Sequence, residues 1–278
     1  MVEGRTTGRG WTRGDLYEER LGRRRSDMLE RRELEGAERR LMNREYVAWD
    51  SPNLRRRMEL LYFGHGGWPM IWFPTSVGRF YQNEDFGLIG AVADLIEAGR
   101  LQVVCVDSVD AESFYATDRP PSERIRRHDS YDRYIAQEVV PWLLGRTGGF
   151  GKVGTLGASF GAYHAANFGF RHPEVVDRVV AFSGKYDIHS FLDGYWDEVC
   201  YFHCPTAYVP NMDSDWIARL SAMDIAIVTG ATDNILSGTT DMIRILNEKG
   251  IRHRSSVWDA PYGHDWPWWK EQIRHYVP

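Results

Sequence analysis

The sequence predicts an α/β domain with a mostly parallel central sheet, helices on both faces of the sheet, and an antiparallel N-terminal edge. From about residue 70 onward, short apolar runs take turns with longer amphipathic segments, as in strands joined by crossover helices. Runs such as QVVCVDS are almost continuously apolar, which is typical of strands buried on both faces. The earlier segments REYVAWDS and LRRRMELLYFG alternate apolar and polar residues instead, which favours an antiparallel pair at a sheet edge.

Each element follows from its own pattern in chain order. Strands are expected at 44–51, 54–64, 70–74, 102–108, 152–159, 178–184, 226–231 and 254–259. Helices are expected near 86–98, 130–144, 160–171 and 234–249, with a last amphipathic helix at the end of the chain. The Gly-rich segment His65-Gly66-Gly67 is interpreted as a hairpin turn. Residues 185–216 are rich in aromatic residues and long for a connection, which predicts an insertion that serves as a lid or binding loop.

Residues 1–41 differ in composition from the rest of the chain. They are rich in Arg and Glu and contain only two aromatic residues, so they cannot form a core of their own. We expect a charged N-terminal extension, either helical or disordered, with an interaction arm as the alternative. The α/β domain is then expected at residues 42–278, and Met42 is a candidate alternative start.

Composition excludes several classes of function. The net charge of -5 provides no basic surface for a nucleic-acid backbone, so no nucleic-acid partner is expected. No signal peptide and no apolar run close to a membrane span of about 20 residues is present, which predicts a cytoplasmic protein with no membrane partner. The oligomeric state stays open.

The three cysteines predict neither a disulfide framework nor a metal site. Cys105 lies within an expected buried strand. Cys200 and Cys204 would share one face of a helix, with His203 beside them, but they lack the second pair of ligands that zinc sites use. We therefore expect no metal and no cofactor.

The motif Gly157-Ala158-Ser159-Phe160-Gly161 follows an expected strand and opens an expected helix. This G-x-S-x-G pattern in that context is typical of a nucleophile elbow, in which a sharp turn exposes a serine at the edge of the sheet. Flanking glycines are needed there because side chains would collide with the turn. Ser159 is therefore the predicted nucleophile.

A serine nucleophile needs a histidine base and a carboxylate that orients the base. Asp233 follows the expected strand 226–231, and His264 follows the last expected strand, so both lie at carboxyl ends of strands in the order Ser, Asp, His. Four rival residues are better explained structurally: Asp259 and Asp265 by their places beside the histidine loop, Asp224 by its place before its strand, and His164 by packing on a helix.

Two backbone amides must stabilise the oxyanion. One is expected from Phe160, the residue after the nucleophile. The other is expected from the loop after the third strand, where Ser76 is the first choice and Thr75 the second. His65-Gly66-Gly67 looks like a lipase oxyanion motif, but it precedes the third strand instead of following it.

Taken together, several segments resemble the putative esterase family of α/β-hydrolases, which includes esterase D, feruloyl esterases, enterochelin esterases and the mycobacterial mycolyltransferases. These segments are FPTSVGRFYQNEDFG, VVCVDS with DAESFY, SYDRYIAQEVVPWL, GASFG, GATD and YGHDW, and the resemblance covers about residue 43 to the end. It implies the α/β-hydrolase fold and the roles already given to Ser159, Asp233, His264, Ser76 and Phe160. Many members have Met where this chain has Phe160, which alters the pocket wall and not the amide.

The expected function is hydrolysis of a small carboxylic ester or thioester through an acyl-enzyme on Ser159. The alternatives are an acyltransferase of the same fold, a non-catalytic binding protein related to α/β-hydrolases, and an RNA-associated protein that uses its Arg-rich N-terminus. Aromatic side chains of the insertion are candidates for the pocket wall, although such clusters are more often plain packing. The candidate pocket residues are Thr75, Tyr186, Trp196 and Tyr201, together with Phe191, Tyr195 and Phe202.

Overall fold

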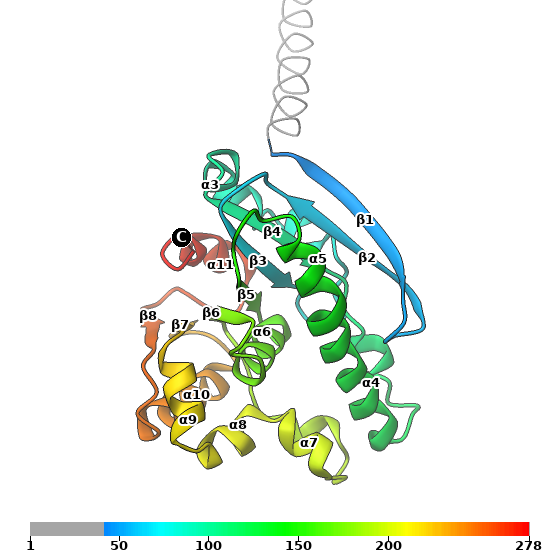
Figure 1. Cartoon of the computed structure of the whole chain (residues 1–278). Coiled ribbons are helices and arrows are strands. Elements are labelled where there is room, and N and C mark those ends of the chain that lie inside the picture. Colours follow the sequence, from blue (N-terminus) through cyan, green and yellow to red (C-terminus); the bar gives the residue numbers. More distant parts are fainter. Residues whose placement is uncertain (1–41, 278) are drawn as a thin grey trace, which may run out of the picture. The chain divides into compact units, whose positions relative to one another are not determined.

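The structure of the protein is a computed structural model that describes residues 42–277. The predicted charged extension, residues 1–41, lies outside the described residues. In the described part, eight strands form one sheet in the spatial order β1-β2-β4-β3-β5-β6-β7-β8 (Figure 1). The strands are β1 Arg44–Ser51, β2 Arg56–Phe63, β3 Trp68–Phe73, β4 Leu101–Val106, β5 Val153–Ala158, β6 Val176–Phe182, β7 Asp224–Gly230 and β8 Arg254–Trp258.

The pairing of the strands confirms the predicted sheet. β1 pairs antiparallel with β2, and β2 pairs antiparallel with β4, whereas every other neighbouring pair is parallel. All six residues of β4 and all six of β5 are buried, as expected for strands covered on both faces. Most of β1 is exposed or half-buried, as expected at an edge. The parallel strands bring their carboxyl ends to one edge of the sheet.

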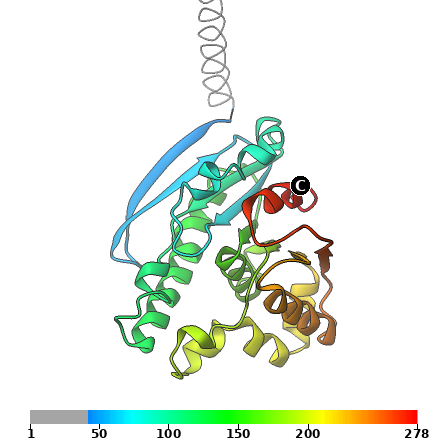
Figure 2. The same cartoon turned by 180° about the vertical axis from the view of Figure 1, so that it is seen from behind.

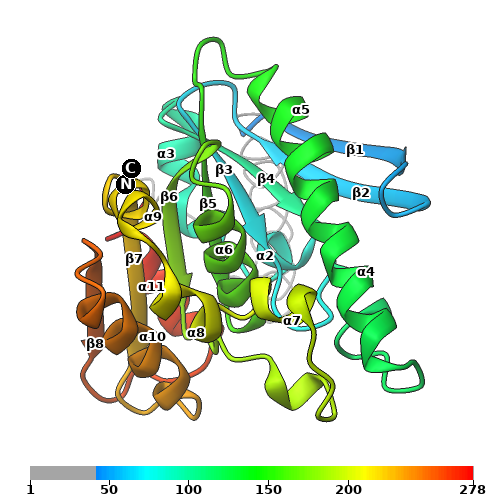
Figure 3. The same cartoon turned by 60° about the horizontal axis from the view of Figure 1, so that its bottom comes forward.

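Helices cover both faces of the sheet. Figure 3 shows α4, α5, α6 and α10 on one face and α3 and α11 on the other. Figure 2 shows the C-terminal helix α11 beside the segment that leads into α3, where it contacts the 3-10 turn Gly90–Val92. No helix in residues 42–277 combines the length and the apolar character needed to cross a lipid bilayer. The helices are α2 Gln82–Asp85, α3 Ala93–Glu97, α4 Pro121–Tyr134, α5 Val140–Leu144, α6 Phe160–Arg171, α7 Glu198–Phe202, α8 Pro205–Tyr208, α9 Ser214–Ser221, α10 Leu236–Glu248 and α11 Trp266–Ile273.

The largest hydrophobic cluster lies between the sheet and the helices α4, α5, α6 and α10. It joins side chains such as Ile71 of β3, Tyr134 of α4 and Met242 of α10, all of which are fully buried. On the opposite face, Ile273 and Trp269 of α11 are buried. Burial of this apolar surface on both sides of the sheet is the main source of stability for the fold.

Two predicted helices differ from the observed ones. The helix expected at 130–144 begins earlier, at Pro121, and a π-helical turn at Ile135–Val139 joins α4 to α5. Pro121 occupies the first turn, where its missing N–H is no loss. The segment expected as one helix at 86–98 contains only the 3-10 turn Gly90–Val92 and the short α3.

The turn at His65-Gly66-Gly67 does not close a hairpin, which corrects the prediction. β2 and β3 both pair with β4, one on each side, so the connection crosses from one side of β4 to the other. Gly67 has a φ of +86°, and a Cβ atom there would lie 2.0 Å from the carbonyl carbon of Arg100. The glycine is therefore needed for a close backbone crossing and not for a turn between paired strands.

The aromatic segment at residues 185–216 lies between β6 and β7 and contains α7, α8 and the first residues of α9. It is attached to α4 by Arg124, a buried arginine. Arg124 donates to the carbonyl oxygen of Phe191 at 2.7 Å and also pairs with the carboxylate of Asp193. These contacts hold the front of the insertion against α4.

Glu138, on the π-helical turn, fastens the β1–β2 hairpin to the helical layer. Its carboxylate accepts hydrogen bonds from Trp49 Nε1 at 2.7 Å, Ser51 Oγ at 2.7 Å and Asn53 Nδ2 at 2.8 Å. We expect Glu138→Ala to lower the free energy of unfolding by about 2 kcal/mol, because three donors lose their acceptor. Urea denaturation followed by circular dichroism measures this change. The exposed neighbour Gln137→Ala serves as control, and equal stability of the two variants would contradict the prediction.

Candidate active site

Ser159 lies on the sharp turn between β5 and α6. Its backbone angles are φ +57° and ψ -124°, a combination that costs a non-glycine residue about 1–3 kcal/mol. The amide of Ser159 donates to the carbonyl oxygen of Phe182 at 2.9 Å, which fixes the turn to the end of β6. The side chain is partly exposed at the carboxyl edge of the sheet, where ligands bind in folds of this class.

Gly157 and Gly161 are required on either side of this turn. A Cβ atom at Gly157 would lie 2.1 Å from the carbonyl oxygen of Gly161, and a Cβ atom at Gly161 would lie 2.5 Å from the carbonyl oxygen of Pro74. Both distances are too short for any side chain. The second contact also brings the start of α6 directly against the loop that follows β3.

His264 lies within hydrogen-bonding distance of both Ser159 and Asp233. Its Nε2 is 2.9 Å from Ser159 Oγ, and its Nδ1 is 3.0 Å from Asp233 Oδ1 and 3.3 Å from Asp233 Oδ2. An ionised carboxylate only accepts, so Nδ1 donates to it and Nε2 is left to accept from the serine hydroxyl. The structure thus brings together the three residues that the sequence places after β5, β7 and β8.

The carboxylate of Asp233 is buried and accepts hydrogen bonds from a backbone amide and a side-chain hydroxyl. Oδ1 accepts from the amide of Ile235 at 2.8 Å, and Oδ2 accepts from Thr229 Oγ1 at 3.1 Å. Burial raises the pKa of this carboxyl, but hydrogen bonds to His264, Ser183 and the Ile235 amide outweigh burial and lower the pKa below its ordinary value. Asp233 is therefore ionised at neutral pH, as a partner of a histidine ring must be.

The loops that contain Asp233 and His264 are tied to each other by Thr232. Its amide donates to the carbonyl oxygen of Tyr262 at 2.9 Å, and its hydroxyl donates to the same oxygen at 2.7 Å. A Cβ atom at Gly230 would lie 2.1 Å from that oxygen, so the two loops are in close backbone contact. This contact sets the distance between the carboxylate and the imidazole.

The loop after β3 holds the amide of Ser76 free between two amides that have partners. The amide of Thr75 donates to Gln82 Oε1 at 2.8 Å, and the amide of Val77 donates to Asp110 Oδ2 at 3.0 Å. Within residues 42–277, no hydrogen bond uses the amide of Ser76. A free amide in this loop is what an oxyanion hole requires.

The second predicted donor, Phe160, is the first residue of α6. Amides in the first turn of a helix have no acceptor within the helix, and the helix dipole adds positive potential there. The contact between Gly161 and Pro74 brings this helix start against the loop of Ser76. Both predicted oxyanion donors therefore belong to segments that touch each other beside Ser159.

The rival residues have other places in the structure. Asp265 caps α11 by accepting from the amide of the next residue at 2.7 Å, and Asp259 is exposed. Asp224 is the first residue of β7, at the opposite edge of the sheet, where it pairs with two arginines. His164 is buried in α6 and pairs with Asp110 instead of approaching the serine.

An aromatic cluster beside the nucleophile includes a residue that the sequence prediction missed. The ring of Phe160 lies 5.7 Å from Phe114, 5.7 Å from Tyr115 and 5.3 Å from Phe191, measured between centroids. The hydroxyl of Tyr115 donates to Ser76 Oγ at 2.9 Å. Tyr115 is the last residue of the segment DAESFY, to which the sequence alone assigned no role.

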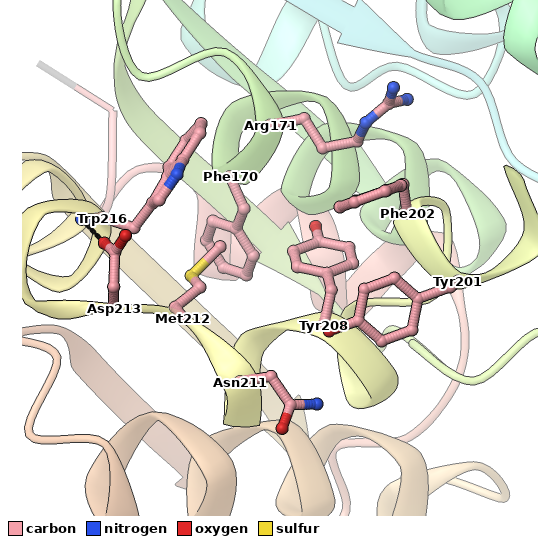
Figure 4. A pocket seen from close by; sticks show the side chains of 9 residues that line it. All are labelled: Phe170, Arg171, Tyr201, Phe202, Tyr208, Asn211, Met212, Asp213 and Trp216. Carbon is pink, nitrogen blue, oxygen red and sulfur yellow. Dashed lines mark hydrogen bonds between the residues drawn. The ribbon is translucent and has the colours of Figure 1, made fainter. Parts of the chain in front are cut away.

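Among the other candidate pocket residues, Tyr195 packs against the cluster that contains Phe160, and Thr75 adjoins Ser76, whereas the rest make other contacts. Tyr186 is fully buried against Gly184, and Trp196 stacks on His189 with ring centroids 4.1 Å apart. Tyr201 lines a cavity of about 340 Å³ at the far end of α6, about 18 Å along the helix from Ser159 at 1.5 Å per residue (Figure 4). The structure therefore separates Tyr201 from the nucleophile, contrary to the prediction. This cavity is lined by Phe170, Arg171, Tyr201, Phe202, Tyr208, Asn211, Met212, Asp213 and Trp216.

One group of potential metal ligands occurs among residues 42–277, namely Asp187, His189 and Cys204, whose ligand atoms lie within 4.8 Å of one another. Asp187 already accepts from the amide of His189 at 2.8 Å and lies 3.0 Å from its Nδ1. Burial raises the pKa of the Cys204 thiol, so the thiolate that a metal prefers is disfavoured. Cys200, four residues before Cys204, does not belong to this group.

Comparisons with known proteins agree with this architecture. Residues 52–278 match the model of the family described as "Putative esterase". No curated protein sequence matches the chain. Among solved structures, a ferulic acid esterase has a TM-score of 0.68 at 18% identity, with 85% of this chain and 96% of that chain covered. An S-formylglutathione hydrolase from Agrobacterium tumefaciens has a TM-score of 0.63 at 16% identity, with 84% and 94% covered.

Mycobacterium tuberculosis MPT51 is also similar, with a TM-score of 0.62 at 14% identity and with 84% of this chain and 99% of that chain covered. At these identities the structural likeness establishes the fold alone, and that fold is the α/β-hydrolase fold that the sequence predicts. The family model, in contrast, spans most of the chain. The chain therefore belongs to the putative esterase family of α/β-hydrolases.

Proposed function

We propose that the protein is a serine esterase that cleaves a small carboxylic ester or thioester through an acyl-enzyme on Ser159. The observation that supports this proposal is the unbroken hydrogen-bonded path from Ser159 Oγ to His264 at 2.9 Å and from His264 to Asp233 at 3.0 Å. A pair of His264 and Asp233 that only stabilised the fold would not need a serine on a strained turn beside the histidine. Nucleophilic catalysis does need one.

In the proposed mechanism, Ser159 Oγ attacks the carbonyl carbon of the ester and its proton passes to His264 Nε2. The carbonyl oxygen becomes an oxyanion that accepts hydrogen bonds from the amides of Ser76 and Phe160. The ionised Asp233 stabilises the imidazolium during this step. Collapse of the intermediate breaks the bond to the leaving group, which takes the proton from His264. Water then attacks the acyl-enzyme by the same steps, releasing the acid and regenerating the serine.

The aromatic side chains around Phe160 support an apolar acyl or aryl group as the part of the substrate next to the reacting carbonyl. Tyr115 is partly exposed, and Phe191 is half-buried, so both rings present a surface beside the nucleophile. Aromatic rings favour flat or apolar ligand groups through area burial and stacking. Short-chain acyl esters and aryl esters are therefore the first substrates to test.

The test combines a substrate screen with active-site labelling. Initial rates are measured with p-nitrophenyl esters of increasing acyl length, with aryl esters and with thioesters, and an added alcohol acceptor reveals acyl transfer. A fluorophosphonate probe is expected to label native protein once per chain, at Ser159 as located by peptide mass spectrometry. Native protein that neither labels nor hydrolyses any of these esters would refute the proposal and favour a non-catalytic binding role.

A further inference from the structure

We infer that Asp110 is a positioning residue for the oxyanion hole, because it connects the loop of Ser76 to the helix that begins at Phe160. This inference rests on the proposed function and deepens it. Asp110 begins the 3-10 turn Asp110–Glu112 after β4, and its exposed fraction is 0%. No step of the proposed mechanism uses its carboxyl group directly. A buried carboxyl group needs hydrogen-bond partners, so its partners indicate what it does.

One oxygen of Asp110 fixes the backbone of the oxyanion loop. Oδ2 accepts from the amide of Val77 at 3.0 Å. Val77 has a φ of +57°, a left-handed conformation that β-branched residues rarely adopt without help. On the other side of Ser76, the amide of Thr75 donates to Gln82 at 2.8 Å. Side-chain acceptors thus occupy the amides before and after Ser76, and the amide of Ser76 is left for the substrate.

The other oxygen of Asp110 connects this loop to α6. Oδ1 lies 2.9 Å from His164 Nε2, and the carboxylate accepts from this ring nitrogen. His164 is 3% exposed, stacks on Phe73 with centroids 5.7 Å apart, and meets the ring of Phe160 edge-on at 4.9 Å. His164 lies about one helical turn beyond Phe160, so it is rigidly connected to the amide of that residue.

Both oxyanion donors are therefore held through the same carboxyl group. The Ser76 amide depends on Asp110 through Val77, and the Phe160 amide is connected to Asp110 through His164. An oxyanion hole acts only when its donors lie within about 2.7–3.1 Å of the developing oxyanion, so a small change in their separation lowers the rate. Asp110 also supports the loop through Tyr115. The carbonyl oxygen of Asp110 accepts from the amide of Tyr115 at 3.0 Å, and the hydroxyl of Tyr115 donates to Ser76 Oγ.

Two substitutions of Asp110 separate this role from general support of the fold. Asp110→Ala removes both acceptors, and we expect kcat per labelled site toward p-nitrophenyl acetate to fall about 10- to 100-fold. This loss is smaller than the loss expected when an oxyanion donor itself is removed. Asp110→Asn keeps an oxygen for the Val77 amide, and its NH₂ group can donate to a neutral His164 ring. We therefore expect Asp110→Asn to retain activity within about 5-fold of native protein.

The decisive readout is binding of an alkyl trifluoromethyl ketone, which adds to Ser159 and places its oxyanion in the hole. In Asp110→Ala, the inhibition constant for the ketone is expected to rise by the same factor as kcat/KM falls, with KM changed less than about 3-fold. Fluorophosphonate titration counts the folded, competent active sites. Rates are divided by this number, so unfolded protein does not lower the measured kcat. A raised KM with an unchanged inhibition constant for the ketone would overturn the inference.

A matched control is Asp132→Ala. Asp132 is also a buried carboxylate paired with a histidine, since its carboxylate lies 2.9 Å from Nε2 of His172, but this pair lies at the C-terminal end of α6, away from Ser159. This control is expected to lose stability while keeping kcat per labelled site.

If Asp110→Ala does not fold, Gln82→Ala tests the same loop. Gln82 is half-buried, and we expect a fall in kcat/KM of about 3- to 10-fold, with an equal rise in the inhibition constant for the ketone.

The outcomes keep this inference apart from the proposed function. If native protein shows no labelling and no hydrolysis, the proposed function fails. If native protein is active and the folded variants of Asp110 and Gln82 keep both kcat and the inhibition constant for the ketone, only the positioning role is overturned. Equal loss of activity in Asp110→Ala and Asp132→Ala per labelled site would also overturn it.

Discussion

The Ser159→Ala variant is expected to lose at least about 10⁴-fold in kcat/KM toward every ester that native protein cleaves. Among residues 42–277, Ser159 Oγ is the only hydrogen-bond partner of His264 Nε2, so no second hydroxyl is placed to replace it. The residual rate would come from the oxyanion amides and from substrate binding, which this substitution leaves in place. Initial rates with a p-nitrophenyl ester and labelling by a fluorophosphonate measure the effect.

The fold of Ser159→Ala is expected to stay intact. Only the hydroxyl oxygen is removed, while the amide of residue 159 still donates to Phe182 at the end of β6. Ser214→Ala, at the exposed start of α9, is the matched control and should keep full activity and full labelling. Labelling that persists in Ser159→Ala would place the nucleophile at another residue.

The strands of this fold were predictable from the sequence because buried parallel strands are short apolar runs. β5, β7 and β8 could each be located within about two residues, and a functional residue just after such a run must lie at the carboxyl edge of the sheet. That rule, together with the order Ser, Asp, His, selects Ser159, Asp233 and His264 without any knowledge of their distances.

Residues 121–129 of α4 were missed because most of their buried face is polar. Arg124 and His128 are buried there beside Ile125, and Asp132, one turn further along, continues the same polar face. Their partners lie far away in the sequence, for example Tyr163 for His128 and His172 for Asp132. Hydrophobic periodicity cannot detect a helix face whose burial depends on such tertiary partners.

The residues that support the oxyanion loop were hidden for a similar reason. Asp110 and Tyr115 belong to a connection between β4 and α4 that has no regular pattern. Their contacts to Val77 and Ser76 span more than thirty residues of chain, as the sequence separations of 33 and 39 show. The sequence predicts which loop supplies the amide, but only the structure shows which side chains hold that loop.

The second large effect is expected for Asp233→Ala, which should lower kcat/KM by about 10⁴-fold. Removal of the carboxylate leaves His264 Nδ1 without an acceptor for its proton and leaves the imidazolium of the transition state without a stabilising charge. The exposed Asp259→Asn is the matched control, since it changes a carboxylate near the same loop and should leave the rate unchanged. Pre-steady-state rates with p-nitrophenyl acetate measure acylation directly.

Asp233→Asn is expected to retain about tenfold more activity than Asp233→Ala, because the surroundings of residue 233 determine how an amide would orient. The Ile235 amide lies 2.8 Å from Oδ1 and needs an acceptor, so the amide oxygen must occupy that position. From there the oxygen still accepts from His264 Nδ1, and the NH₂ group faces Thr229 Oγ1, which can accept. The useful tautomer of His264 is then preserved, and only the negative charge is lost. If Asp233→Asn were as inactive as Asp233→Ala, the negative charge would be the whole contribution of Asp233, and the orienting role assigned to it would be wrong.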